Sequence, residues 1–81
     1  MITLKQAFRL CEIRDDEIIW LRPKGTARHW ATPYTGQEIR KKKDMKRIKV
    51  LHIHIRFCFG EAEGFEFEIT DESPVKEENV E

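Results

Sequence analysis

The chain has 81 residues, of which 15 are Lys or Arg and 15 are Asp or Glu, so its formal net charge is zero. This length accommodates one small domain and excludes a second. A hydrophobic content of 40% is enough for a core, which argues against wholesale disorder. No apolar run approaches the roughly 18 residues of a membrane helix, and the N-terminus lacks the apolar segment of a signal peptide. We therefore expect a cytoplasmic protein that does not contact membranes and keeps Cys11 and Cys58 as free thiols.

The first element is predicted to be a helix over residues 4–12. Thr3 and Gln6 have the spacing of a capping box, in which the Thr hydroxyl and the Gln amide each bind a free backbone N–H. Apolar side chains then recur at helical spacing, while the polar ones fall on the other side.

Two strands are predicted next. Residues 17–22 are rich in β-branched and aromatic side chains and stop at Pro23, which favours a strand. After a turn over residues 23–26, residues 27–32 form a possible returning strand, which Pro33 would close.

A short basic helix is predicted over residues 36–44. Thr35 and Glu38 repeat the capping-box spacing, and Ile39 and Met45 are the apolar residues that would anchor the helix. The Lys and Arg residues near its C-terminal end suit the helix dipole.

The longest predicted feature is a β-hairpin. Residues 50–59 alternate strictly, and we expect one row to face the core: Leu51, Ile53, Ile55, Phe57 and Phe59. Residues 60–64 are predicted as a loop bracketed by glycines, and residues 65–69 as the returning strand. In the expected register, Phe59 lies opposite Phe65 on the core side of the hairpin. The same register places Arg56 opposite Glu68 on the outer side.

These elements predict an α+β fold in the order α-β-(β)-α-β-β, with two short helices on an antiparallel sheet in a single domain of residues 1–70. A winged-helix-like fold is the nearest alternative, because a terminal hairpin follows a basic helix, but residues 13–34 do not supply its third helix. Residues 71–81 are predicted to be an acidic, disordered tail.

The strongest lead to function is the basic segment 39–49. Its seven positive charges are opposed only by Asp44: Arg40, Lys41, Lys42, Lys43, Lys46, Arg47 and Lys49. Such density neutralises phosphates and releases counterions, which favours DNA or RNA as the partner. On one continuous helix, Arg40, Lys43 and Arg47 would share a face. A solvated basic surface and an acidic protein partner are the alternatives.

Two residues outside this segment are further candidates for nucleic-acid contacts. Arg28 and Trp30 lie in the weakly patterned middle of the chain, where they could reach bases or sugars.

The hairpin supports a hypothesis of another class, a protein-interaction module or inhibitor. Its acidic residues would offer a phosphate-like face to a basic protein partner: Glu61, Glu63, Glu66 and Glu68. A structural homodimer through the edge of the long strand is a third possibility, since a domain this small is marginal alone.

Enzyme and metal signals are weak. His52, His54 and Cys58 share one strand face, but Cys58 is about 13 Å from His54 along a strand, so we expect charge pairs there and no metal site. The chain has no nucleophile elbow and no phosphate-binding glycine loop, so we expect no cofactor and no enzymatic activity.

The zero net charge is a cancellation between two halves of the chain. Residues 1–56 carry 14 basic and 6 acidic side chains, whereas residues 57–81 carry 1 basic and 9 acidic ones. The sequence therefore predicts a molecule with a basic and an acidic part, which suits an electrostatic partner.

Overall fold

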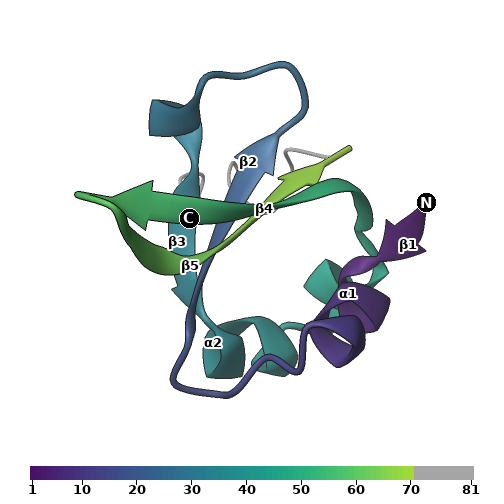
Figure 1. Ribbon diagram of the computed structural model, residues 1–81. Coiled ribbons are helices and arrows are strands. Elements are labelled where there is room, and N and C mark those ends of the chain that lie inside the picture. The colour runs from purple at the N-terminus through teal and green to yellow at the C-terminus, as the bar shows by residue number, and fades with distance from the viewer. Residues whose placement is uncertain (71–81) are drawn as a thin grey trace, which may run out of the picture.

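Two short helices pack on one side of a five-stranded sheet in the computed structural model, which describes residues 1–70 (Figure 1). The strands are β1 (Ile2–Thr3), β2 (Ile18–Pro23), β3 (Thr32–Thr35), β4 (Lys49–Cys58) and β5 (Glu61–Ile69). The helices are α1 (Leu4–Leu10) and α2 (Gly36–Lys41), and two 3-10 turns are η1 (Arg28–Trp30) and η2 (Lys43–Arg47). The predicted α+β class is confirmed, and a five-stranded sheet replaces the winged-helix alternative.

Two further sequence predictions concern the C-terminal tail and contact with membranes. The predicted tail, residues 71–81, lies outside the described residues. Neither helix within residues 1–70 has the length and apolar character that crossing a bilayer requires.

Both predicted capping boxes are present. At α1, the Thr3 hydroxyl accepts the backbone N–H of Gln6 at 3.2 Å, and the Gln6 side chain accepts that of Thr3 at 2.8 Å. At α2, Thr35 and Glu38 make the same pair of bonds at 3.1 and 2.9 Å. Each reciprocal pair satisfies two N–H groups that the helix leaves free, which is why both helices begin where the sequence predicts.

The second helix ends earlier than predicted. The backbone is extended at Lys42 (φ −95°, ψ 97°), and the chain continues as the η2 turn, whose Met45 is buried. The predicted single helix is therefore wrong over residues 42–44, because only Ile39 anchors α2 and Met45 anchors a separate turn.

The sheet is mixed, which corrects the predicted antiparallel arrangement. Its strand order is β1-β4-β5-β2-β3, and β2 pairs with β5 in parallel, with Leu21 opposite Phe67. The other three pairings are antiparallel. A parallel pair needs a long crossover connection, and the chain between β2 and β5, which includes α2, supplies one.

The third strand lies later in the chain than predicted. Residues 28–30 form the η1 turn, and β3 includes Pro33, which the sequence analysis placed just after the strand. Pro33 is tolerated because β3 is the edge of the sheet, where a strand bonds a neighbour on one side only.

The hairpin register also differs from the prediction. Ile55 lies opposite Phe65 and Ile53 opposite Phe67, four residues away from the expected pairing. The chain turns at Phe59 and Gly60, which both have positive φ (52° and 81°), so a two-residue turn replaces the predicted five-residue loop. Gly64 is therefore in a strand, where a Cβ would lie 2.6 Å from the carbonyl oxygen of Ile18. This glycine permits the close approach of β5 to β2.

The core lies between the helices and one half of the sheet. Phe8 of α1 packs edge-on against Phe67 of β5, with 6.2 Å between ring centroids, and the buried set also includes Leu4, Ile39 and Ile69. The far half of β4 is not covered by the helices. The predicted core row is consequently exposed there, to 39% at Ile53, 53% at Ile55, 58% at Phe57 and 102% at Phe59.

Candidate functional site

A groove lined by basic side chains runs between α1 and the η2 turn. Its first part has a volume of about 460 Å³ and is lined by one Thr and five cationic residues: Thr3, Lys5, Lys43, Lys46, Arg47 and Lys49. Two contacts bring these segments together. β1 pairs with the start of β4, with Thr3 opposite Lys49, and the backbone N–H of Leu4 donates to the carbonyl of Ile48 at 2.7 Å.

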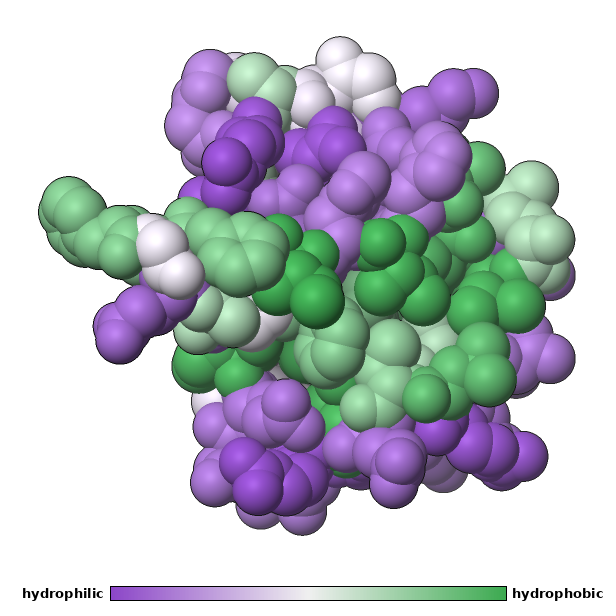
Figure 2. Space-filling view, viewed as in Figure 1, coloured by the Kyte–Doolittle hydropathy of each residue, from purple (hydrophilic) through white to green (hydrophobic). Residues whose placement is uncertain are grey.

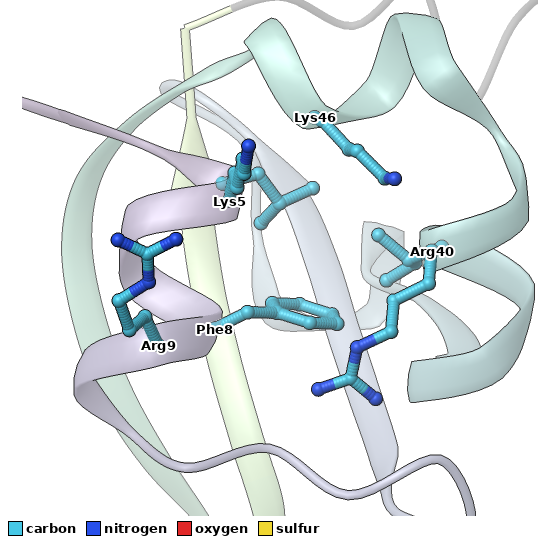
Figure 3. Close-up of a pocket in the computed structure, with 7 residues that line it drawn as sticks. Lys5, Phe8, Arg9, Arg40 and Lys46 are labelled. Atoms are coloured by element: carbon cyan, nitrogen blue, oxygen red, sulfur yellow. The ribbon is translucent and has the colours of Figure 1, made fainter.

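The second part of the groove has an apolar floor. It encloses about 320 Å³ and is lined by Leu4, Lys5, Phe8, Arg9, Ile39, Arg40 and Lys46. Figure 3 shows the Phe8 ring at its centre, with Lys5 and Arg9 on the α1 side and Lys46 and Arg40 on the opposite side. Because Lys5 and Lys46 line both parts, we treat the two pockets as one feature, the basic groove.

Most cations of the basic groove form no ion pair within the described part of the chain. Among residues 1–70, no carboxylate forms an ion pair with six of its side chains: Lys5, Arg9, Lys43, Lys46, Arg47 and Lys49. Arg40 differs from them. Its guanidinium binds the Asp15 carboxylate and the carbonyl oxygen of Ile13, and it lies 5.3 Å from the Phe8 ring centroid. Arg40 thus holds the loop after α1 against α2 and contributes its stem to the groove.

The structure brings together, in the basic groove, five of the seven residues predicted in the basic segment: Arg40, Lys43, Lys46, Arg47 and Lys49. The shared helix face predicted for Arg40, Lys43 and Arg47 is wrong, because the helix ends before Lys43. Lys41 is exposed on α2, and Lys42 lies over the Tyr34 ring at 5.7 Å.

Sequence reasoning missed Lys5 and Arg9 as members of the site. Their spacing of four residues on α1 placed them together on its polar side, but nothing local indicated what that side faces. The pairing of β1 with β4 and the bond from the Leu4 N–H to the Ile48 carbonyl bring α1 beside η2.

Arg28 and Trp30 belong to a different part of the molecule. They lie in η1, between β2 and β3, at the opposite end of Figure 1 from α1 and α2. Trp30 is 61% exposed and lies beside His29, with 5.8 Å between the ring centroids and the rings tilted by 37°. Arg28 lines a separate pocket of about 250 Å³ together with Arg22, His54, Ile55, Arg56 and Glu66. Neither residue lines the basic groove.

The acidic residues of the hairpin divide into two groups. Glu61 and Glu63 lie near the turn and are exposed, and Glu63 pairs with Arg56 at 3.4 Å. Glu66 is instead buried to 4% exposure, which corrects its predicted place on an open outer surface. Its two carboxylate oxygens accept bonds from Arg22 Nε and Arg56 Nη1, both at 2.9 Å.

Arg56 also connects Glu66 to the aromatic residue beneath it. Its guanidinium lies 4.1 Å from the centroid of the Trp20 ring. Glu66, Arg22, Arg56 and Trp20 therefore form a cluster on the sheet face opposite the helices, which we call the buried ion-pair cluster. Each arginine also contacts a second carboxylate, Glu68 for Arg22 and Glu63 for Arg56.

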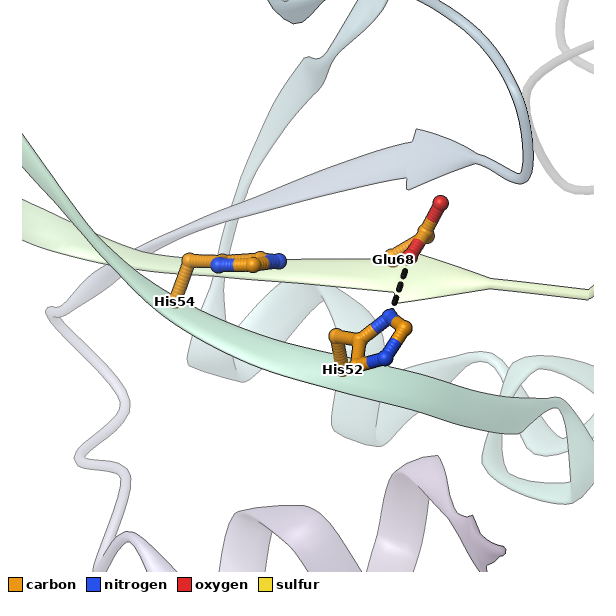
Figure 4. Close-up of side chains that lie close together, drawn as sticks. All are labelled: His52, His54 and Glu68. Atoms are coloured by element: carbon orange, nitrogen blue, oxygen red, sulfur yellow. Dashed lines mark hydrogen bonds and ion pairs between the residues drawn. The ribbon is translucent and has the colours of Figure 1, made fainter.

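Two histidines and a carboxylate meet beside this cluster. His52 Nδ1 lies 2.5 Å from Glu68 Oε1, and His54 is 5.9 Å from His52 between ring centroids (Figure 4). One potential ligand atom from each of His52, His54 and Glu68 lies within 4.8 Å of the others, so these residues could hold a metal ion. The sequence groups the histidines with Cys58 and predicts Glu68 opposite Arg56, whereas in the observed register Glu68 lies opposite His52.

The contact with His52 affects Glu68 directly. The hydrogen bond from His52 is the main cause that lowers the pKa of the Glu68 carboxyl from its ordinary value of 4.5, with smaller contributions from the Gly25 backbone and Arg22. Because its pKa is lowered in the fold, Glu68 stabilises the folded state at a pH above the ordinary pKa of 4.5. This stabilisation is lost as the pH falls through the lowered pKa.

We expect the substitution His52→Ala to raise the pKa of Glu68 towards 4.5, because it removes that hydrogen bond. A carboxyl carbon titration followed by NMR measures this shift. His54→Ala is the matched control and should leave the Glu68 pKa where it is. An unchanged value in His52→Ala would contradict the assignment of the cause.

We found no family model, no curated protein and no solved structure that matches the chain.

Proposed function

We propose that this protein is a small non-enzymatic accessory protein that binds nucleic acid through the phosphates, in the basic groove. The observation that carries the proposal is the convergence of three separate segments on one groove. α1, η2 and the first residue of β4 each contribute cations, and six of these side chains have no carboxylate partner among residues 1–70.

The physical basis is electrostatic. Unpaired Lys and Arg side chains that neutralise phosphates release condensed counterions, which drives binding without regard to base sequence. Lysine supplies a compact charge on a flexible stem, which tolerates different backbone geometries. The apolar floor at Leu4, Phe8 and Ile39 is buried, so the cations around it supply the contacts to the ligand.

The test is equilibrium binding of the full chain to labelled duplex and single-stranded DNA and RNA, measured by fluorescence polarisation. We expect binding at about 50 mM salt, with a logarithmic affinity that falls steeply and linearly with the logarithm of the salt concentration. Duplexes of unrelated sequence should bind within a few-fold of one another, since phosphate contacts carry no sequence information. No detectable binding to any of the four probes at this salt concentration would refute the proposal.

A further inference from the structure

The edge of β4 is open over most of its length. β1 pairs with β4 only at Val50 and Lys49, whereas β5 pairs along the other edge as far as Cys58. Within residues 1–70, no strand lies against the outer edge of β4 beyond Val50. The segment from Leu51 to Cys58 therefore presents backbone N–H and C=O groups that another strand could bind.

The same segment carries large apolar side chains that water contacts. Ile53, Ile55 and Phe57 are exposed to 39%, 53% and 58%, and Phe59 at the turn is fully exposed. Figure 2 shows an apolar band that runs from the projecting hairpin across this face, between hydrophilic regions on both sides. Soluble monomers rarely leave a contiguous apolar patch of this kind uncovered, and an apolar open edge is a template for strand pairing.

We propose that the occupant of this edge is a second copy of the chain, which forms a symmetric dimer through antiparallel pairing of the two β4 strands. A two-fold axis at Ile55 makes that residue face its own copy. Ile53 then lies opposite Phe57 of the second copy. Ile53, Ile55 and Phe57 are all apolar, so this register buries the exposed row against itself.

Charge complementarity favours a second copy over an unrelated strand. The start of β4 lies beside the cations Arg47 and Lys49, whereas the hairpin turn carries Glu61 and Glu63. Antiparallel pairing brings the acidic turn of each copy to the basic start of β4 in the other. The same surface thus supplies both complementary charges, as an isologous interface requires. The apolar row that pairs does not line the basic groove, whereas Arg47 and Lys49 do, so the dimer and nucleic-acid binding are tested separately.

The first experiment is sedimentation equilibrium of the full chain over a concentration series. We expect a monomer–dimer equilibrium whose dissociation constant rises about 10-fold or more in Ile55→Lys, because two lysines would face each other on the axis. Leu10→Lys is the matched control, since Leu10 is 70% exposed on α1 and away from this edge. A chain that stays monomeric at all concentrations overturns the proposal. Assembly that Ile55→Lys does not weaken does the same.

The second experiment tests the register. In a chain with Cys11→Ser and Cys58→Ser, the substitution Ile55→Cys places two thiols opposite each other across the axis, within the Cα separation that a disulfide spans. We expect efficient oxidation to a covalent dimer, and little with Leu10→Cys in the same background. Equal cross-linking at both positions, or none at position 55, would overturn the register. If β4 pairs with a strand of another protein instead, the isolated chain stays monomeric. The expected covalent dimer excludes that alternative.

Discussion

The substitution Glu66→Ala should lower the free energy of unfolding by about 3 kcal/mol, because it removes the buried carboxylate that two half-buried guanidinium groups share. The Arg22 and Arg56 side chains are 13% and 16% exposed, and each binds one Glu66 oxygen at 2.9 Å. Removal of one member of a buried ion-pair cluster costs more than the cluster contributes as a whole, since the remaining charges keep their desolvation penalty.

Urea denaturation followed by circular dichroism measures this loss. Glu63→Ala is the matched control, because its side chain is 42% exposed and contacts the same Arg56. Surface pairs of that kind contribute little, so we expect a change within about 0.5 kcal/mol. If Glu66→Ala changes stability no more than Glu63→Ala, the cluster does not have the structural role argued for it.

The second large effect concerns the basic groove. The double substitution Lys5→Gln/Lys46→Gln should weaken nucleic-acid binding about 100-fold at low salt, on the basis of about tenfold for each charge-assisted contact. The slope of logarithmic affinity against logarithmic salt should become shallower by about 2, since each lost phosphate contact removes about 0.9. Lys5 and Lys46 were chosen because both line the two parts of the groove.

The control for this variant removes the same net charge elsewhere. Lys24→Gln/Arg28→Gln alters two exposed cations that do not line the groove. It also tests the role that the sequence analysis gave to Arg28. An equal loss of affinity in both variants would mean that overall charge, and no particular surface, determines binding.

The sequence revealed the elements that are set by local chemistry. The two capping boxes fixed the starts of α1 and α2, and alternation located β4 and β5. It did not reveal how these elements pair. The register of the hairpin depends on a two-residue turn at Phe59 and Gly60, and the parallel pairing of β2 with β5 depends on a distant crossover.

Alternation also cannot tell how far the helices extend over the sheet. The row that includes Ile55 and Phe57 points to the core side of the sheet, but α1 and α2 are too short to cover its far half. Glu66 is the opposite case. It reads as a surface residue, and it is buried because Arg22 and Arg56 converge on it from two neighbouring strands.

The candidate site was predictable only in part for a related reason. A run of cations is visible in composition, so Lys43, Lys46, Arg47 and Lys49 were found. The α1 cations join them through contacts between residues more than 40 positions apart, which no local pattern reports.

Mapping by NMR tests binding in the basic groove most directly. The isotope-labelled full chain would be titrated with an unlabelled duplex of arbitrary sequence, and backbone amide shifts would be followed. Binding in the groove predicts the largest changes at Lys5, Arg9 and residues 43–49, and their reversal as salt is added. Changes confined to the η1 turn around Trp30 or to Glu61 and Glu63, with the groove amides unmoved, would contradict it.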